Sequence, residues 1–324
     1  MRGAKEIYIA TYDEILERIK RRYSKGVKGR LSGLQMVHDV LLSSTEGVEE
    51  LERLLRDLHP FYWRLIEIEF ERGKIESSLR CLSKARYMVR RLWEKYRRLV
   101  AVLGGEEGRR AYVEGRGRMV SLFRRCRQDM VLLKNLVVFL QRLPSIEPDA
   151  PTLILAGPPN VGKSTFVGNV SSGRPEVADY PFTTKQVIVG HAHHRGRRVQ
   201  VIDTPGLLDR PVEDMNAIER RAIAALSELR GAVLFLIDPV STYMSLERQV
   251  KVLEGISDLL EGRPVYLGIN KVDLAGEEQL GEAVRRAGEL KRAGAVEEVY
   301  LLSAISREQA LRVMEDILSR ALPP

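Results

Sequence analysis

Apolar side chains in residues 5–143 recur at three- and four-residue steps, a spacing that predicts helices. The clearest segment, residues 75–100, has one apolar face formed by Ile75, Leu79, Leu82, Val89, Trp93, Tyr96 and Val100. Residues 8–19, 48–70 and 119–143 have a similar pattern. About four long helices predict an antiparallel bundle. We expect a turn at Gly104 and Gly105, and a last long helix that opens at Gly115 and Gly117.

The pattern changes after a proline-rich stretch, PSIEPDAP, at residues 144–151, which we interpret as a linker. Short apolar runs then alternate with helical segments, at residues 153–156, 199–202, 233–237, 265–269 and 299–302. This alternation is typical of a parallel α/β sheet. The predicted fold is an N-terminal helical bundle, residues 1–145, followed by an α/β domain, residues 146–324, with a mainly parallel six-stranded sheet.

Charge divides the chain in the same way. Residues 1–150 contain 31 Lys and Arg against 21 Asp and Glu, whereas residues 151–324 contain 21 against 23. The basic excess of the N-terminal half favours a polyanionic partner. No apolar run reaches 18 residues, and the N-terminus lacks the apolar core of a signal peptide, so we expect no membrane partner and a cytoplasmic location. Cys81 and Cys126 are expected to be small buried thiols, reduced in that compartment.

A glycine-rich motif, GPPNVGKST, spans residues 157–165 between a predicted strand and a predicted helix. Its glycines let backbone N–H groups turn toward phosphate oxygens, and the helix directs its positive N-terminus at the same charge. We expect Lys163 to reach the β- and γ-phosphates of a nucleotide and Ser164 to bind Mg²⁺. The expected phosphate-binding residues are Asn160, Val161, Gly162, Lys163, Ser164 and Thr165.

The base is selected by a second motif, Asn270-Lys271-Val272-Asp273, which follows a predicted strand. A carboxylate at Asp273 can accept hydrogen bonds from both N1–H and the 2-amino group of guanine, a pair that adenine lacks. Asn270 is expected to contact the base edge and to tie back to the phosphate loop. Backbone N–H groups of Ser303, Ala304 and Ile305 are expected to face the guanine oxygen. GTP and GDP are therefore the predicted ligands.

Two segments between these motifs are expected to sense the γ-phosphate. In Asp203-Thr204-Pro205-Gly206, Asp203 would hold Mg²⁺ through water and Gly206 would donate its amide to the γ-phosphate. In DYPFTTK, residues 179–185, we favour Thr184 over Thr183 as the residue that binds Mg²⁺ while GTP is present. The expected catalytic residues are Lys163, Thr184 and Gly206, and the expected metal ligands are Ser164, Thr184 and Asp203.

In this order, GPPNVGKST, DYPFTTK, DTPG, NKVD and SAI resemble the motifs of the translation-factor-related class of small GTPases, and DYPFTTK resembles the Obg-like group. The basic helical half and the stretch DPVSTYMSLERQ, residues 238–249, resemble the nucleolar GTP-binding (Nog) family. The short chain looks like the archaeal form of that family. The resemblance implies slow GTP hydrolysis and a role in large ribosomal subunit assembly.

Leu207 occupies the position where Ras-like GTPases carry a glutamine that orients the attacking water. Hydrolysis therefore requires another route. Either a partner such as the ribosome supplies the missing group, or K⁺ binds beside the phosphates with Asn160 as a ligand. A protein that binds nucleotide as a ribosomal scaffold with negligible turnover, or a GTPase partner in RNA modification, remains an alternative.

A row of cations lies opposite the apolar face of residues 75–100 and consists of Arg80, Lys84, Arg91, Lys95 and Arg98. At 100° per residue these side chains fall within about 60° of one another, a geometry that suits a phosphate backbone. Ribosomal RNA or a large-subunit precursor is the expected partner, with a solvated helix face, or an acidic membrane or protein surface, as the alternatives. For the stretch that holds His191, His193, His194 and Arg195, a metal site, an RNA contact and a solvated hairpin remain open.

Overall fold

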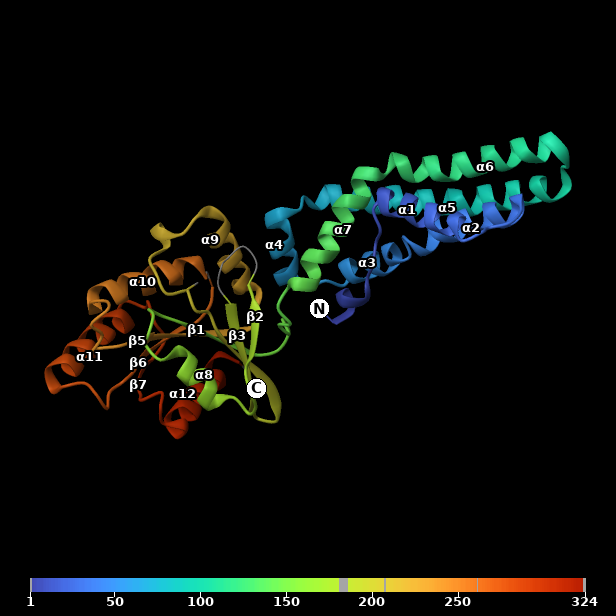
Figure 1. Cartoon of the computed structure of the whole chain (residues 1–324). Coiled ribbons are helices and arrows are strands. Elements are labelled where there is room, and N and C mark those ends of the chain that lie inside the picture. The colour runs from blue at the N-terminus through green and yellow to red at the C-terminus, as the bar shows by residue number, and fades with distance from the viewer. Residues whose placement is uncertain (1, 181–185, 207, 261, 323–324) are drawn as a thin grey trace. The chain divides into compact units, whose positions relative to one another are not determined.

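The computed structural model describes residues 2–180, 186–206, 208–260 and 262–322, and these form two compact units (Figure 1). One unit comprises Met1–Leu58 and Glu69–Arg142, and the other comprises His59–Ile68 and Leu143–Pro324. The first unit is helical and the second contains a mostly parallel sheet. The predicted fold class is therefore confirmed.

The helical unit is built around two long antiparallel neighbours, α5 (Arg72–Val102) and α6 (Gly105–Arg125), which lie side by side (Figure 1). The turn between them contains Gly105 at φ 52°, as predicted for this glycine pair. The apolar face of α5 is buried, with Ile75 and Val89 fully inaccessible to solvent. The other elements of this unit are η1 (Arg2–Glu6), α1 (Tyr12–Ser24), α2 (Arg30–Ser43), α3 (Gly47–Arg56) and α7 (Arg127–Arg142).

Three helix predictions are wrong in detail, one of them because the segment 119–143 is divided between α6 and α7, and a further helix was missed. The segment 48–70 is two helices, α3 and α4 (Pro60–Glu69), because the chain breaks before a proline that suits a first helical position. Gly115 does not open a helix but lies inside α6, where a Cβ would come within 2.6 Å of Tyr96 Cγ, so it permits close packing on α5. The helix α2 was not predicted, because apolar residues such as the exposed Leu31 also lie away from its buried face and blur the periodicity.

The proline-rich stretch expected to be a linker is held against the second unit. Tyr62 of α4 donates its hydroxyl to the backbone oxygens of Pro144, at 3.1 Å, and Ile146, at 2.6 Å. Burial raises the pKa of the Tyr62 hydroxyl, which keeps this donor protonated. The Gln200 side chain pairs with the backbone of Glu147 on the other side of the stretch. These bonds fix the chain just before the first strand.

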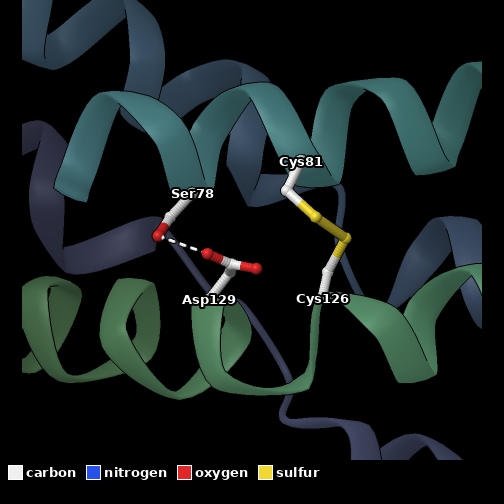
Figure 2. Close-up of a disulfide and its surroundings, with 4 residues drawn as sticks. All are labelled: Ser78, Cys81, Cys126 and Asp129. Atoms are coloured by element: carbon white, nitrogen blue, oxygen red, sulfur yellow. Dashed lines mark hydrogen bonds between the residues drawn. A yellow bond between two sulfur atoms is a disulfide. The ribbon is translucent and has the colours of Figure 1, made fainter. Parts of the chain in front are cut away.

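Cys81 and Cys126 form a disulfide between α5 and the residue that ends α6 (Figure 2). The expectation of two reduced thiols is therefore wrong, because helix packing brings together cysteines that are 45 residues apart. In the chain-entropy model a loop of this length stabilises the fold by roughly 4 kcal/mol. Asp129 lies nearby and accepts a hydrogen bond from Ser78 Oγ at 2.8 Å. Because both sulfurs share the disulfide, this cluster offers no thiolate for a metal.

The sheet has seven strands in the described residues, in the order β2-β3-β4-β1-β5-β6-β7, where six were expected. Strands β4, β1, β5, β6 and β7 are parallel, and β2 and β3 add an antiparallel edge. The strands are β1 (Thr152–Ala156), β2 (Glu176–Asp179), β3 (Gln186–His194), β4 (Arg197–Asp203), β5 (Gly231–Ile237), β6 (Val265–Ile269) and β7 (Val299–Leu301).

Helices cover both faces of this sheet, as parallel strands require. On one face α8 (Lys163–Val170) and α12 (Arg307–Ala321) pack into a core that includes Leu155, Phe166 and Met314. The helices α10 (Leu246–Leu259) and α11 (Glu277–Arg292) pack against the other face. The connecting elements are η2 (Val212–Asp214), α9 (Ala217–Ala224) and η3 (Ala225–Glu228). Within the described ranges, no helix is both long enough and apolar enough to cross a membrane.

Candidate functional site

The glycine-rich loop connects β1 to α8 at the carboxyl edge of the sheet, where parallel α/β folds bind ligands. Gly157 has φ 128° and Gly162 has φ 103°, conformations that favour glycine. A Cβ on Gly157 would lie 2.3 Å from the oxygen of Leu236, and one on Gly162 would lie 2.3 Å from Asn270 Nδ2. Both glycines are therefore needed for the loop to close against its neighbours and turn into α8.

Lys163, the first residue of α8, is folded over this loop. Its Nζ donates to the backbone oxygens of Gly157, at 2.6 Å, and Pro158, at 2.8 Å, and the residue is only 7% exposed. Burial holds the pKa of Lys163 below its ordinary value, while Asp203 and Asp209 act in the opposite direction. The arrangement places a partly desolvated cation where it can exchange carbonyl partners for phosphate oxygens.

Ser164 and Asp203 meet directly, since Ser164 Oγ donates to Asp203 Oδ2 at 2.6 Å. The other carboxylate oxygen, Asp203 Oδ1, is buried and has no hydrogen-bond partner in the described part of the chain. Burial raises the pKa of Asp203, and the bond from Ser164 and the charge of Lys163 oppose this rise. A hydroxyl beside a carboxylate with a free buried oxygen is a donor set that fits Mg²⁺, which prefers hard oxygen ligands and retains water.

Asn270 joins three segments that are far apart in the sequence. It follows β6 directly and is 2% exposed. Its Nδ2 donates to the oxygen of Val161 in the phosphate loop at 2.6 Å, and its Oδ1 accepts from the backbone N–H of Ala304 at 2.7 Å. The tie from Asn270 to the phosphate loop, expected from the sequence, is therefore present. The same side chain also positions the segment after β7.

The remaining residues that the sequence predicts to recognise the base lie at the same edge. Asp273 is exposed and makes no hydrogen bond or ion pair with any described residue, so its carboxylate is available to a ligand. In the segment after β7, the N–H of Ser303 already donates to Gln309 Oε1 at 2.7 Å, and that of Ala304 donates to Asn270. The N–H of Ile305 therefore remains as the unengaged donor of this trio in the described structure.

Sequence reasoning missed a polar network behind Lys271. Asp238 directly follows β5, is 3% exposed, and accepts from Lys271 Nζ at 2.7 Å. Gln249 of α10 fixes Asp238 by bonding both its backbone N–H and its backbone oxygen, each at 2.9 Å. The position of Asp238, immediately after a buried strand at the ligand-binding edge, is the signal that could have identified it. Lys271 itself has φ 59°.

The remaining expected site residues make few side-chain contacts or lie outside the described residues. Val161 is buried in the core, and Asn160 and Thr165 are exposed, with Asn160 at φ 65°. Gly206 has φ 73°, and the neighbouring Leu208 accepts a hydrogen bond from Gly157 N–H at 2.8 Å. Thr184, Thr183 and Leu207 lie outside the described residues.

Two family models match the chain over separate segments. Residues 13–147 match the NOG1 N-terminal helical domain, and residues 152–271 match a 50S ribosome-binding GTPase. Nucleolar GTP-binding protein 1 of Caenorhabditis elegans is 39% identical over 263 residues, covering 79% of this chain and 37% of the relative. The Drosophila melanogaster protein of the same name is 34% identical, covering 95% of this chain and 46% of the relative. The chain thus spans less than half the length of these relatives.

A crystal structure of a nucleolar GTP-binding protein 1 from Plasmodium falciparum is also similar, with 30% identity and a TM-score of 0.46. The match covers 55% of this chain and 91% of that one. The names of the relatives contradict one expectation. Proteins called nucleolar point to the nucleolus, so the prediction of a cytoplasmic location is wrong.

Proposed function

Because the chain belongs to the nucleolar GTP-binding (Nog) family, we propose that its guanine-nucleotide domain hydrolyses GTP slowly in large ribosomal subunit assembly, with ribosomal RNA bound by the helical unit. Its GTPase domain implies a bound guanine nucleotide. The residues that would hold it are those gathered at the carboxyl edge of the sheet. Lys163 would neutralise phosphate charge, Asp273 would select guanine, and Ser164 and Asp203 would hold Mg²⁺, which shields the charge of the β- and γ-phosphates.

The observation that carries the RNA part of this proposal is the state of the basic stripe on α5, defined as Arg80, Lys84, Arg91, Lys95 and Arg98. All five side chains are exposed. Arg80 has an acid, Glu76, at 3.9 Å, but the other four have no ion-pair partner in the part of the chain that the structure describes. Elsewhere on α5, Arg97 pairs with Glu94 at 2.9 Å. Arg91 and Lys95 contact the rings of Tyr87 and Tyr96, and cations left without an acidic partner favour a polyanion as the ligand.

Reversing three of these charges tests the RNA contact. The triple variant Lys84→Glu, Arg91→Glu, Lys95→Glu is expected to weaken binding of the full chain to large-subunit rRNA by roughly 100-fold at 0.1 M salt. The slope of log Kd against log salt should fall by about 3, because three phosphate contacts are lost. Filter binding across a salt series measures both quantities.

A matched control reverses three exposed arginines of the same unit that already pair with acids, in Arg56→Glu, Arg72→Glu, Arg109→Glu. The net charge changes equally in the two variants. Equal weakening by both would show that the total charge, and not the stripe, determines RNA affinity. Unchanged affinity in the stripe variant would refute the RNA contact on α5.

For hydrolysis without a glutamine at position 207, we propose that K⁺ assists at the phosphates, with the Asn160 amide as a ligand. Asn160 is exposed, has φ 65°, and donates no side-chain hydrogen bond to any described residue. A cation at this loop would offset charge that develops between the phosphates. Phosphate release should be faster in KCl than in NaCl at equal ionic strength by at least about tenfold, a lower bound set below the roughly 10²–10³-fold effect that one transition-state contact typically has. Asn160→Ala should remove the difference, whereas equal rates in the two salts for the unmodified chain would rule potassium out.

A further inference from the structure

The second unit contains a basic cavity at the edge of the sheet opposite the candidate nucleotide site. It has a volume of about 190 Å³ and is lined by Pro151, His194, Arg195, Arg197, Val199, Arg230 and Leu322. Pro151 precedes β1, Arg230 precedes β5, Arg195 lies in the turn before β4, and Arg197 is the first residue of β4. The nucleotide-site residues follow the other ends of the same three strands. At about 3.3 Å per residue, strands of this length separate the two sites by roughly 16–23 Å.

The charges around this cavity have one sign. The side chains of Arg195, Arg197 and Arg230 are exposed. Those of Arg197 and Arg230 form no hydrogen bond or ion pair with the described residues, and Arg195 bonds only the neutral Ser319 Oγ, at 3.3 Å. The nearby acid Glu147 is already paired with Arg198 at 3.0 Å. Guanidinium groups without intramolecular partners are free to bind phosphate bidentately.

The β3–β4 turn, which carries Arg195 beside Arg197, gives a second, independent observation. Residues Arg195 and Gly196 connect two strands that pair up to His194 and Arg197, and both have positive φ, at 49° and 74°. Such two-residue turns favour Asn or Gly at the first central position, because other side chains are strained there. An arginine at that position gives up local stability in exchange for a cation at the tip, which motivates a functional explanation.

The lining of the cavity also has an apolar part, called its floor below, which consists of Val199, Pro151 and Leu322. A surface with planar guanidinium groups around an apolar floor suits a flat aromatic ring whose attached phosphate is negative. An unstacked RNA base satisfies both requirements, whereas bases inside an RNA duplex do not expose their faces. An acidic peptide would match the charge of the arginines, but its acidic residues would not cover the apolar floor, and separate apolar residues would be needed for that.

We propose that this cavity binds one unpaired nucleotide of RNA, with its base on the apolar floor and its phosphate between Arg197 and Arg230. This inference rests on the proposed function in that RNA is the ligand, but it concerns a surface separate from the stripe on α5. Because the cavity is at the opposite edge from the phosphate loop, RNA and guanine nucleotide can occupy the unit together. The His194 ring, which lies 3.3 Å from Ser319 Oγ, supports the wall of the cavity.

The test uses the full chain and the double variant Arg197→Glu, Arg230→Glu. Affinity for a single-stranded 12-nucleotide oligouridine should fall by roughly 10- to 30-fold, and the salt slope should fall by about 1.4. Affinity for a 12-base-pair RNA duplex should change less than threefold. GDP affinity should remain within twofold of the unmodified chain, since the nucleotide site is untouched. The pair Arg197→Lys, Arg230→Lys keeps the charge and should restore part of the single-strand affinity.

A matched control, Arg285→Glu with Arg312→Glu, reverses two exposed arginines of the same unit that are paired with Glu289 and Glu308. It should alter single-strand affinity less than twofold. Ultraviolet crosslinking of the oligouridine should also label the peptide around residues 194–199. An equal loss in the control, an equal loss on duplex RNA, or no crosslink at this hairpin would overturn the cavity assignment.

The failure of this inference is distinguishable from that of the proposed function. If the unmodified chain binds rRNA through the stripe on α5 but the double variant Arg197→Glu, Arg230→Glu binds oligouridine normally, the cavity assignment alone is wrong. If the triple variant of the stripe keeps full rRNA affinity while the double variant Arg197→Glu, Arg230→Glu loses affinity for single-stranded RNA, the RNA contact on α5 is wrong and the cavity assignment stands.

Discussion

Replacing Asp273 by Asn is expected to abolish the preference for guanine and to weaken GDP binding by roughly 10³-fold or more. The carboxylate can accept both N1–H and the 2-amino group of the base, whereas an amide offers one acceptor and one donor. The donor would then face the 2-amino group and leave it without a partner, and sites built on hydrogen bonds discriminate by about 10⁴–10⁵. Titration calorimetry with GDP, ADP and xanthosine diphosphate measures the change.

Xanthine separates loss of recognition from loss of folding. Its 2-oxygen accepts a hydrogen bond where guanine donates one, so Asp273→Asn should bind xanthosine diphosphate more tightly than GDP. Asp258→Asn, which removes an exposed carboxylate of α10, is the matched control and should leave GDP affinity within twofold. If the unmodified chain binds ADP as tightly as GDP, the assignment of Asp273 is wrong regardless of the variants.

The candidate nucleotide site could be located from the sequence because each of its parts is local. A glycine-rich loop or an Asn-Lys-x-Asp segment carries its own backbone requirements within a few residues. Apolar runs place each segment at the end of a strand, and the carboxyl ends of parallel strands meet at one edge. The sequence could therefore bring Lys163, Asp203 and Asn270 to the same edge before any contact was visible.

Contacts that depend on packing between distant segments could not be predicted from local sequence patterns. The Cys81–Cys126 disulfide depends on the way α5 and α6 pack, and neither residue has a local signal for its partner. Gly115 has the composition of a helix break, but the ring of Tyr96 explains why a glycine is needed there. Likewise, α4 belongs to the second unit through Tyr62 and the proline-rich stretch, which no periodicity reveals.

The hydrogen bonds inside the site also divide into those that a local motif predicts and those that depend on packing between distant segments. The motif predicted that Asn270 would tie back to the phosphate loop, and it does. It did not reveal that the Asn270 oxygen would engage the N–H of Ala304, nor that Gln309 would engage that of Ser303. These partners come from α12 and from the end of β6, and their approach is set by the sheet and its helix layer. Of the three N–H groups predicted to face the guanine oxygen, that of Ile305 is therefore the unengaged one in the described structure.

The second large effect is expected at Asn270 itself. Asn270→Ala would leave the oxygen of Val161 and the N–H of Ala304 without their buried partner, and each unsatisfied group costs about 1–3 kcal/mol. We therefore expect the free energy of unfolding to fall by roughly 2–5 kcal/mol. GDP affinity should fall by roughly 100-fold or more, because phosphate and base segments are no longer held together, and one lost constraint of about 3 kcal/mol corresponds to that factor.

Asn169→Ala provides the comparison that isolates the coupling. Asn169 of α8 donates to the backbone oxygens of Ala304, at 2.7 Å, and Ile305, at 3.1 Å, and has no bond to the phosphate loop. Its removal should loosen the base segment alone and weaken GDP less than tenfold. Denaturant unfolding with and without saturating GDP, combined with GDP titration, measures both properties for both variants. If Asn270→Ala loses no more GDP affinity than Asn169→Ala, then Asn270 acts on the base segment only, and the phosphate loop is positioned by its own glycines and Lys163.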